Sequence, residues 1–456
     1  MNMAVQDTTN TDQQQERKLC QFVEELLEGR VTNIERLPRW RPAWNVDLKR
    51  GDEIIKLHIR GERGGDVSPF PDLRREADIL TLIRQQGIPA PRIYGFCEDP
   101  QAIVMQNVPG TRDLSQAKDN EERLSLAKQY IDAMAAMHKL PLDAFVARGI
   151  DLPHGAEAIS LAGLEAYYPL YERNKTRPQP LLEFALNWLR RNVPQHRIKP
   201  SLVQYDSGQY LFENGKVNAL YDFEFAMIGD PLADLASARM RDNYEPLGGP
   251  FSELYRYYQE VSGEKPEPDV VRFHTALFST VSAMQFSATV ATPQPGDPHD
   301  TYIEFDIALR RVVVHAMAEA MGAEIAPPAI NIVEHGPNAE LLSMLTDAVN
   351  QVQIKDEFQQ TKLNAVRKIV EYLGRADAMI NQLQAVDMQE AGVLLGCSFA
   401  HHDEMEAALE RFVATAGTEH DLALLALFAS QIERRVQVFG QTAIGRSASH
   451  IDLPAL

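Results

Sequence analysis

The spacing of apolar residues divides the first 110 residues into two helices and a group of short strands. Apolar positions recur every three or four residues between Glu16 and Glu28, which is typical of an amphipathic helix. A second helix is predicted over 71–84, where the Gly87-Ile88-Pro89 run ends it. Shorter apolar runs have strand character instead, at 31–37, 44–48, 52–59, 92–97 and 102–107. We expect these runs to form a small antiparallel sheet.

Beyond residue 110 the pattern becomes mainly helical. The exception is a set of short apolar runs at 202–204, 209–212 and 217–223, the last two separated by Glu213-Asn214-Gly215-Lys216. An Asn-Gly pair between apolar runs is the strongest short-range signal for a β-hairpin. Helical periodicity then resumes and continues to residue 321. We therefore predict a helical lobe that carries one hairpin.

Proline, glycine and polar stretches mark the boundaries between segments. The first fifteen residues are polar and lack the basic start and apolar run of a secretory signal. Pro327-Pro328 and the His335-Gly336-Pro337 run indicate a linker. The predicted organisation is a disordered tail at 1–15, an N-terminal lobe at 16–110, a helical lobe at 111–322, a linker at 323–338 and a C-terminal helical domain at 339–456.

Composition narrows the classes of partner and compartment. Forty-five Lys and Arg against 64 Asp and Glu give a net charge of −19, which would repel a nucleic acid backbone. No stretch approaches the roughly 18–20 apolar residues of a membrane helix. Three widely spaced cysteines make neither a disulfide framework nor a metal-binding spacing. We expect a protein of the reducing cytoplasm that binds neither nucleic acid nor membrane.

The segment from Leu202 to Arg241 carries the clearest chemical signal. It contains Asp206 in a loop and Asp222 at the end of the predicted hairpin. This segment resembles the catalytic region of aminoglycoside-phosphotransferase-like kinases, which share the protein-kinase-like arrangement. The resemblance implies an α+β, bilobal fold, with a small antiparallel-sheet N-terminal lobe for the nucleotide and a mostly helical C-terminal lobe, followed here by a C-terminal all-α domain. It also implies ATP and Mg²⁺ as cosubstrate and cofactor.

The resemblance assigns roles to individual residues. Phosphoryl transfer needs a divalent ion on the phosphates and a separate group that orients the hydroxyl and takes its proton. Asp222 matches the metal-binding position and Asp206 the catalytic one. Lys56 and Glu76 match the phosphate-contacting base and its ion-pair partner. Glu224, on the same strand face as Asp222, is a candidate for supporting the metal. The acyl-CoA-dehydrogenase-associated kinases are similar in the C-terminal lobe.

Two parts of the chain depart from the family pattern. The usual His-Gly-Asp loop with an Asn five residues later is replaced by Gln204-Tyr205-Asp206 with Gln209, a shortened loop that resembles a divergent subgroup with an Asp-Ser-Gly-Gln sequence. Gln209 offers a carbonyl oxygen in place of the Asn. The nucleotide loop contains no glycine, so Arg39 and Arg41 are the candidates for binding phosphate through their side chains.

These patterns leave three functional hypotheses open. The first is an ATP-dependent phosphotransferase acting on a hydroxyl of a small metabolite. The second is a non-catalytic module that binds a nucleotide or metabolite, which the missing glycines and the displaced amide favour. The third is a different transfer reaction in the same cleft with another nucleotide. The C-terminal helices carry no chemical motif, and they are candidates for packing on the body, forming a bundle or mediating self-association.

Overall fold

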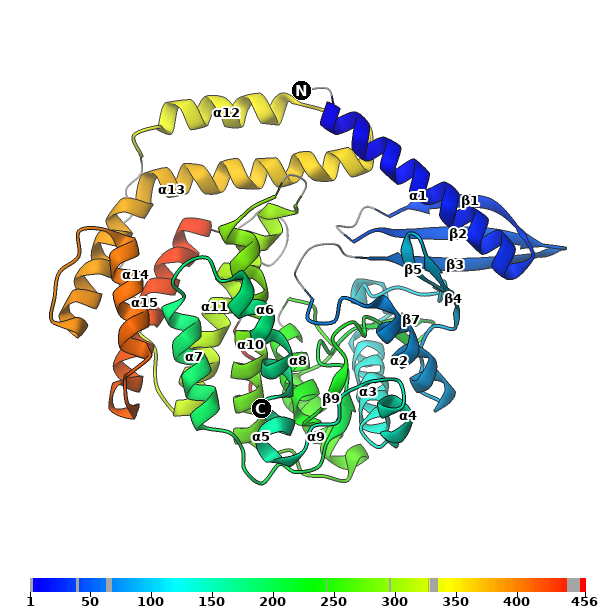
Figure 1. Ribbon diagram of the computed structural model, residues 1–456, viewed down its shortest axis with the longest axis horizontal. Helices are drawn as coiled ribbons and strands as arrows, with labels where there is room; N and C mark the ends of the chain where they lie inside the picture. Colours follow the sequence, from blue (N-terminus) through cyan, green and yellow to red (C-terminus); the bar gives the residue numbers. More distant parts are fainter. Residues whose placement is uncertain are drawn as a thin grey trace.

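A sheet-containing lobe and a larger helical body make up the molecule (Figure 1). The computed structural model describes residues 3–37, 41–62, 68–242, 244–294, 297–326, 328, 335–440 and 452–456. Arg39 therefore lies outside the described residues, as does much of the predicted linker at 323–338. Within the described residues, no helix combines the length and apolar character needed to cross a membrane.

The N-terminal lobe is a five-stranded antiparallel sheet in the order β1-β2-β3-β5-β4. One helix covers its outer face and another follows the third strand (Figure 1). All five strands predicted from the apolar runs are present. The elements are α1 (Met3–Leu27), β1 (Arg30–Arg36), β2 (Ala43–Arg50), β3 (Glu53–Gly61), α2 (Leu73–Gln85), β4 (Ile93–Glu98) and β5 (Gln101–Gln106).

Alternation along β3 sends its side chains to two different faces. Ile55, Leu57 and Ile59 are buried in a cluster with Leu19 and Val23 of α1. The intervening positions point to the opposite face, toward the helical body, because successive strand residues alternate. The helix α1 begins at Met3, within the stretch predicted to be a disordered tail. From Met3 that stretch is helical rather than irregular, and it runs without a break into the amphipathic turns that follow.

The helical body contains the predicted hairpin. Strands β7 and β8 pair antiparallel, and Asn214 and Gly215 both have positive φ, at 53° and 74°. Such a turn matches the twist of the flanking strands. The elements are η1 (Leu114–Gln116), α3 (Asn120–Met137), α4 (Asp143–Val146), α5 (Gly155–Ser160), α6 (Ala162–Asn174), α7 (Pro180–Arg191), β6 (Ser201–Val203), β7 (Tyr210–Glu213), β8 (Lys216–Leu220), β9 (Met227–Gly229), α8 (Leu232–Asp242), α9 (Phe251–Ser262), α10 (Pro268–Ala291) and α11 (His299–Met321).

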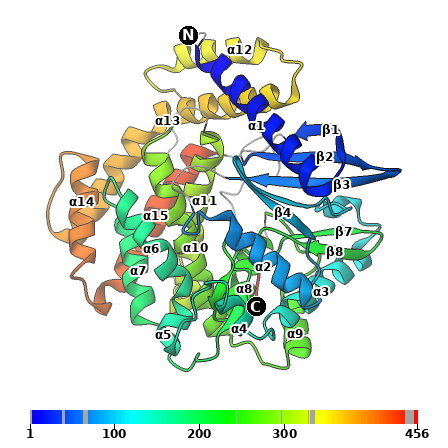
Figure 2. The ribbon, with the colours of Figure 1, turned by 45° about the vertical axis from the view of Figure 1, so that its right-hand side comes forward.

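The C-terminal helices pack on this body, one of the arrangements that the sequence leaves open. Phe184 of α7 and Phe428 of α15 are both buried, with ring centroids 5.7 Å apart. One apolar cluster includes residues of α7, α10, α11, α14 and α15. Figure 2 shows α12 and α13 crossing above the body, toward α1. The elements are α12 (Ala339–Gln351), α13 (Glu357–Leu395), α14 (His402–Val413), η2 (Thr418–His420) and α15 (Asp421–Phe439).

Candidate active site

The loop between β6 and β7 is held from below by one buried carboxylate. Asp234, in the first turn of α8, is completely buried. It accepts hydrogen bonds from the backbone N–H groups of Gln204 (3.0 Å) and Tyr205 (2.8 Å) and from the Ser207 hydroxyl (2.7 Å). His138 Nε2 lies 3.0 Å from Asp234 Oδ2, the oxygen that also accepts the Gln204 N–H. A charge-assisted network of this kind fixes the loop in one conformation.

This loop presents Asp206, but both of its carboxylate oxygens are engaged. The Arg241 guanidinium, from the end of α8, donates to Oδ1. The Gln209 amide donates to Oδ2 at 3.0 Å and to the Asp206 backbone oxygen at 3.1 Å. Burial raises the pKa of Asp206, while Arg241 opposes that rise. The proposed base is thus held in place by an arginine that the sequence reasoning did not select.

Gly208 allows the loop to pass close to that arginine. Its φ is +98°, a region that residues with a side chain rarely adopt. A Cβ at this position would lie 3.1 Å from Cδ of Arg241 and 3.3 Å from Leu247. The Asp-Ser-Gly-Gln loop therefore needs a glycine here, both for its conformation and for its close approach to α8.

Asp222 stands just beyond the hairpin with strained backbone geometry. Its φ is +63°, unusual for a residue with a side chain. Arg60 of β3 donates to Asp222 Oδ1 at 2.5 Å. Burial would raise the pKa of Asp222, but Arg60 and Arg41 outweigh it and lower the pKa to about 2. Strained residues cluster at ligand sites, and this one is ionised and only partly covered.

Glu76 ties α2 both to strand β3 and to the irregular segment after β8. Its Oε2 accepts from Arg60 Nε at 3.0 Å, and its Oε1 accepts the backbone N–H of Phe223 at 3.1 Å. Burial raises the pKa of Glu76, and the positive charge of Arg60 acts in the opposite direction. Glu76 thereby positions Arg60 and the backbone next to Asp222 at the same time.

Arg41 completes a network of five buried or half-buried charges. It pairs with Glu224, and its Nη1 lies 4.0 Å from Glu76 Oε2. Three carboxylates and two guanidinium groups give the network one net negative charge. Such a network requires compensation by a cation, or a rearrangement, when an anionic phosphate enters. Arg41 and Arg60 are the two positive groups of this network.

The structure corrects the pairing predicted for Lys56. Glu76 binds Arg60, and Lys56 is exposed. Both basic residues share a face of β3, but four residues of strand separate them by roughly 13 Å. Glu76 lies at the Arg60 end of that interval, within hydrogen-bond distance of Arg60. The signal that could have found Arg60 is the alternation itself, because Arg60 is the basic residue of that face nearest the end of the strand.

Glu224 and Gln209 also lie differently from the prediction. The strand β8 ends at Leu220, so Glu224 sits in an irregular segment rather than on a shared strand face with Asp222. Its carboxylate is taken up by Arg41. Gln209 directs its amide nitrogen at Asp206, which leaves its carbonyl oxygen as the remaining polar atom. Of the three predicted metal ligands, Asp222 is the one with a partly open carboxylate.

The donor set near Asp222 suits magnesium better than a transition metal. Mg²⁺ prefers oxygen ligands and usually takes one or two carboxylates, with waters and substrate phosphates completing the shell. Asp222 would supply the carboxylate, and the Gln209 carbonyl remains the sequence-based candidate for a second protein oxygen. The described residues contain no group of three acidic, histidine or cysteine side chains that could hold a metal unaided.

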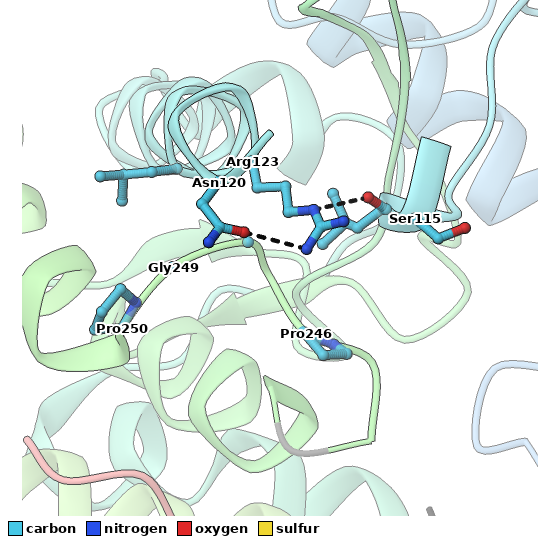
Figure 3. A pocket seen from close by; sticks show the side chains of 9 residues that line it. Ser115, Asn120, Arg123, Pro246, Gly249 and Pro250 are labelled. Carbon is cyan, nitrogen blue, oxygen red and sulfur yellow. Dashed lines mark hydrogen bonds between the residues drawn. The ribbon is translucent and has the colours of Figure 1, made fainter. Parts of the chain in front are cut away.

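Two hollows lie beside the loop. The tyrosine cavity, of about 350 Å³, is lined by Tyr210, Tyr221 and Tyr244 together with Arg112, Gly208 and Glu245. A second hollow of about 500 Å³ adjoins it across Leu114, Ser115 and Pro246. Figure 3 shows this second hollow between Arg123 and the Pro246 to Pro250 segment. Arg123 is occupied there, since its Nε donates to the Leu114 oxygen at 3.0 Å.

Comparison with known proteins places the same region in one family. Residues 48–274 match the model of the phosphotransferase enzyme family. A crystal structure from Ralstonia eutropha, assigned as an aminoglycoside phosphotransferase, superposes with a TM-score of 0.53 at 17% identity, covering 68% of this chain and 99% of that one. This likeness shows the shared bilobal fold.

Curated relatives match a similar stretch. Acyl-CoA dehydrogenase family member 10 of Mus musculus is 24% identical over 199 residues, which is 40% of this chain and 18% of the relative. Family member 11 of Homo sapiens is 24% identical over 205 residues, or 41% and 25%. The match thus spans at most a quarter of the length of these relatives.

Proposed function

We propose that this chain, which belongs through residues 48–274 to the phosphotransferase enzyme family, is an ATP-dependent phosphotransferase. It would transfer the γ-phosphoryl group of ATP to a hydroxyl of a small molecule. The observation that carries the proposal is the Arg60-Glu76-Asp222 network beside the Asp206 loop. It joins a basic strand residue, a helical glutamate and a metal-binding carboxylate across the two lobes. Phosphoryl transfer requires this set of charges.

The chain's own residues would divide the work between phosphate and acceptor. Arg60 and Arg41 would bind nucleotide phosphates, because guanidinium is permanently charged and matches phosphate oxygens in pairs. Arg39 remains a further candidate on sequence grounds. Glu76 would keep Arg60 pointed at the phosphates. Mg²⁺, held by Asp222 with the carbonyl oxygen of Gln209, would neutralise phosphate charge when bound.

Asp206 would orient the acceptor hydroxyl and accept its proton. A general base must lie within hydrogen-bond reach of the proton that it removes. Its raised pKa makes the carboxylate more basic than an ordinary aspartate. The Arg241 contact has to loosen, or be shared with the acceptor, before Asp206 can take the proton. The reaction forms an O–P bond to the acceptor and breaks the bond to the β-phosphate oxygen, with the proton passing to Asp206.

A specific observation favours the second candidate, a binding module without transfer. Both oxygens of Asp206 and the carboxylate of Glu224 are engaged by protein side chains. A site stabilised in this state would bind a nucleotide or metabolite while catalysing no transfer. The two candidates predict different outcomes for the same protein once ATP and acceptor are supplied together.

The proposed compartment is the cytoplasm, and the proposed partner is a hydroxylated small molecule. Cys20, Cys97 and Cys397 are all free thiols, and Cys397 is exposed. Free thiols persist in reducing compartments. The net charge of −19 supports a function without nucleic acid.

Calorimetric titration with ATP, with and without Mg²⁺, tests the proposal. We expect binding that depends on magnesium in the unaltered chain and that falls at least tenfold in Asp222→Asn. The exposed residue Asp269 provides the control, as Asp269→Asn, because it lies on α10 away from the cleft. Binding that ignores both magnesium and the Asp222 substitution would contradict the metal assignment. Magnesium-dependent binding without ADP release across an acceptor screen would favour the binding module.

A further inference from the structure

The tyrosine cavity opens beside both carboxylates of the candidate active site. Gly208 lies two residues after Asp206, and Tyr221 immediately precedes Asp222. Tyr244 and Asp206 are close enough to influence each other electrostatically. A molecule bound in this cavity of about 350 Å³ would therefore lie close to Asp206. This volume is in the range of small-ligand sites.

Two charged side chains of the cavity wall, Arg112 and Glu245, begin an alternating chain of charges that continues behind the wall to Asp206. Arg112 Nη1 lies 3.3 Å from Glu245 Oε1, and Arg241 Nη1 lies 2.5 Å from Glu245 Oε2. Arg241 in turn binds Asp206. Each positive group in this chain is followed by a negative one, so the four charges of the chain cancel. The chain therefore leaves neither sign over to attract a strongly charged ligand.

The remaining acidic residue on the wall is also engaged. Asp113 accepts the backbone N–H of Ser115 at 2.9 Å and begins the 3-10 turn η1. Hydrogen bonds from Ser115 lower the pKa of Asp113, which keeps it ionised as a cap. A polycationic acceptor needs several open carboxylates, and this cavity offers none that lacks a protein partner.

The aromatic rings supply the other half of the recognition surface. The Tyr210 hydroxyl donates to the Leu247 oxygen at 2.5 Å, so Tyr210 is anchored by its polar end. Tyr244 is fixed between the Arg241 guanidinium, 5.6 Å from its ring centroid, and the ring of Phe305. Rigid aromatic faces bordered by hydrogen-bonding groups suit a ring that is apolar on its faces and hydroxylated at its edge.

We infer that the tyrosine cavity is the acceptor subsite and that it takes an uncharged, polyhydroxylated ring, such as a neutral sugar, in preference to a cationic or anionic one. The inference rests on the proposed function, since it names the acceptor class of that reaction. The balanced chain Arg112-Glu245-Arg241-Asp206 sets the charge preference, and the three tyrosines set the shape. An acceptor hydroxyl next to Arg241 would share that guanidinium with Asp206.

One other source of the same chemistry is the ribose of a nucleotide, because it too is a neutral hydroxylated ring. The cavity wall includes Arg112 to Ser115, which follow the last strand of the N-terminal lobe. The two sources predict different competition between ADP and a free sugar. An acceptor in the cavity binds together with ADP, whereas a ribose site would make ADP and a free sugar exclude each other.

Saturation-transfer NMR with three matched sugars tests the inference on the full chain. Glucose, glucosamine and glucuronate share one ring and differ in charge when titrated at about pH 6.5. We expect glucose to bind at least about tenfold more tightly than either charged sugar, both with and without ADP. A charged sugar that binds more tightly, competition between ADP and glucose, or no binding of any of the three would overturn the inference.

Variants of the cavity wall separate shape from charge. Tyr244→Ala should weaken glucose binding at least fivefold, while Tyr244→Phe should retain most of it. Tyr257→Ala, on α9 where the hydroxyl donates to Asp132, is the control and should change nothing. Arg112→Ala removes one partner of Glu245 and should improve glucosamine binding relative to glucose. An unchanged preference in Arg112→Ala would contradict the charge argument.

Failure of the proposed function gives a different result. Because sugar binding is read without any transfer step, neutral-sugar preference can be seen even when ATP does not bind. That combination would keep the cavity as a sugar site and reject the phosphotransferase. ATP binding together with a preference for a charged sugar would keep the phosphotransferase proposal and reject the neutral-sugar subsite.

Discussion

Arg60 shows how a single side chain connects the two lobes. It contacts Glu76 from α2 and Asp222 from beyond the hairpin, and it is largely buried. Removing one member of such a group leaves the others charged and without compensation, which is costlier than losing an exposed pair. Lys56 lies on the same strand face and is exposed, so it provides a matched comparison.

Replacing each of these two residues should separate their contributions. We expect Arg60→Met to lower the free energy of unfolding by about 3 kcal/mol, because it leaves Glu76 and Asp222 without their shared partner. Lys56→Met should change it by less than about 0.5 kcal/mol. Urea denaturation followed by circular dichroism measures both values. Equal effects from the two substitutions would show that Arg60 does not hold the network together.

Asp222 should make stability depend on pH in the acid range. Its pKa is lowered to about 2 in the folded chain, below the roughly 3.9 of an unfolded aspartate. The ionised form is therefore favoured by folding, and its contribution is present above about pH 4 and lost as the pH falls toward 2. A shift from about 3.9 to about 2 corresponds to about 2.6 kcal/mol in full, of which about 2 kcal/mol is lost between pH 5 and pH 2.

Unfolding titrations between about pH 5 and pH 2 measure this contribution. The unaltered chain should lose about 2 kcal/mol more than Asp222→Asn over that interval, because the asparagine cannot be protonated. The control Asp269→Asn should follow the unaltered chain, since Asp269 is exposed. Parallel curves for the unaltered chain and Asp222→Asn would mean that Arg60 does not stabilise the ionised carboxylate.

At the scale of elements, α15 acts as part of the body rather than as an appendage. Phe428 lies against Phe184 of α7, and both rings are buried. Arg191 of α7 also donates to Asp421, at the start of α15, at 2.7 Å. Contacts of this kind join the segment after the linker to helices that precede the hairpin.

Truncating one residue of α15 tests whether these contacts join the C-terminal helices to the body. Phe428→Ala should lower the free energy of unfolding by about 3–5 kcal/mol, the range for removing a buried phenylalanine. Leu422→Ala on the same helix should cost little, because Leu422 is 62% exposed. A single cooperative denaturation curve that shifts in Phe428→Ala supports one shared core. A shift confined to a separate transition would instead show that the C-terminal helices unfold independently.

At the scale of the whole molecule, α12 has a surface that the other described residues do not cover. Leu341, Met344 and Leu345 are 67%, 68% and 45% exposed, and none of the residues of α12 is buried. Exposed apolar side chains on one helix are a common feature of interfaces between protein chains. Self-association through the C-terminal helices therefore remains our proposal, and this face of α12 is its candidate surface.

Sedimentation velocity over a range of concentrations tests self-association. We expect the sedimentation coefficient to rise with concentration in the unaltered chain and to stay constant in a Leu341→Ser, Met344→Ser double variant. Leu422→Ser removes an exposed leucine elsewhere and serves as the control. A chain that sediments as a monomer at every concentration, or a double variant that behaves like the unaltered chain, would reject α12 as the contact.

The sequence by itself determined the elements and the two central carboxylates. Local periodicity specified the sheet strands and the hairpin, because alternation and the Asn-Gly turn are properties of neighbouring residues. The Asp206 and Asp222 positions followed from the resemblance of one continuous segment. The small pairing of β6 with β9 escaped prediction, since three-residue strands carry too little pattern.

Only the tertiary structure decided which charges meet. Arg60 and Glu76 are 16 positions apart, Arg41 and Glu224 are 183 apart, and Arg241 and Asp206 are 35 apart. No local sequence pattern relates such residues, and the sequence offers several other lysines and arginines that could pair with the same carboxylates. The choice of Arg60 over Lys56 depends on where β3 crosses α2, and the engagement of Asp206 depends on where α8 ends. Those positions are set by packing of the two lobes and not by any one segment.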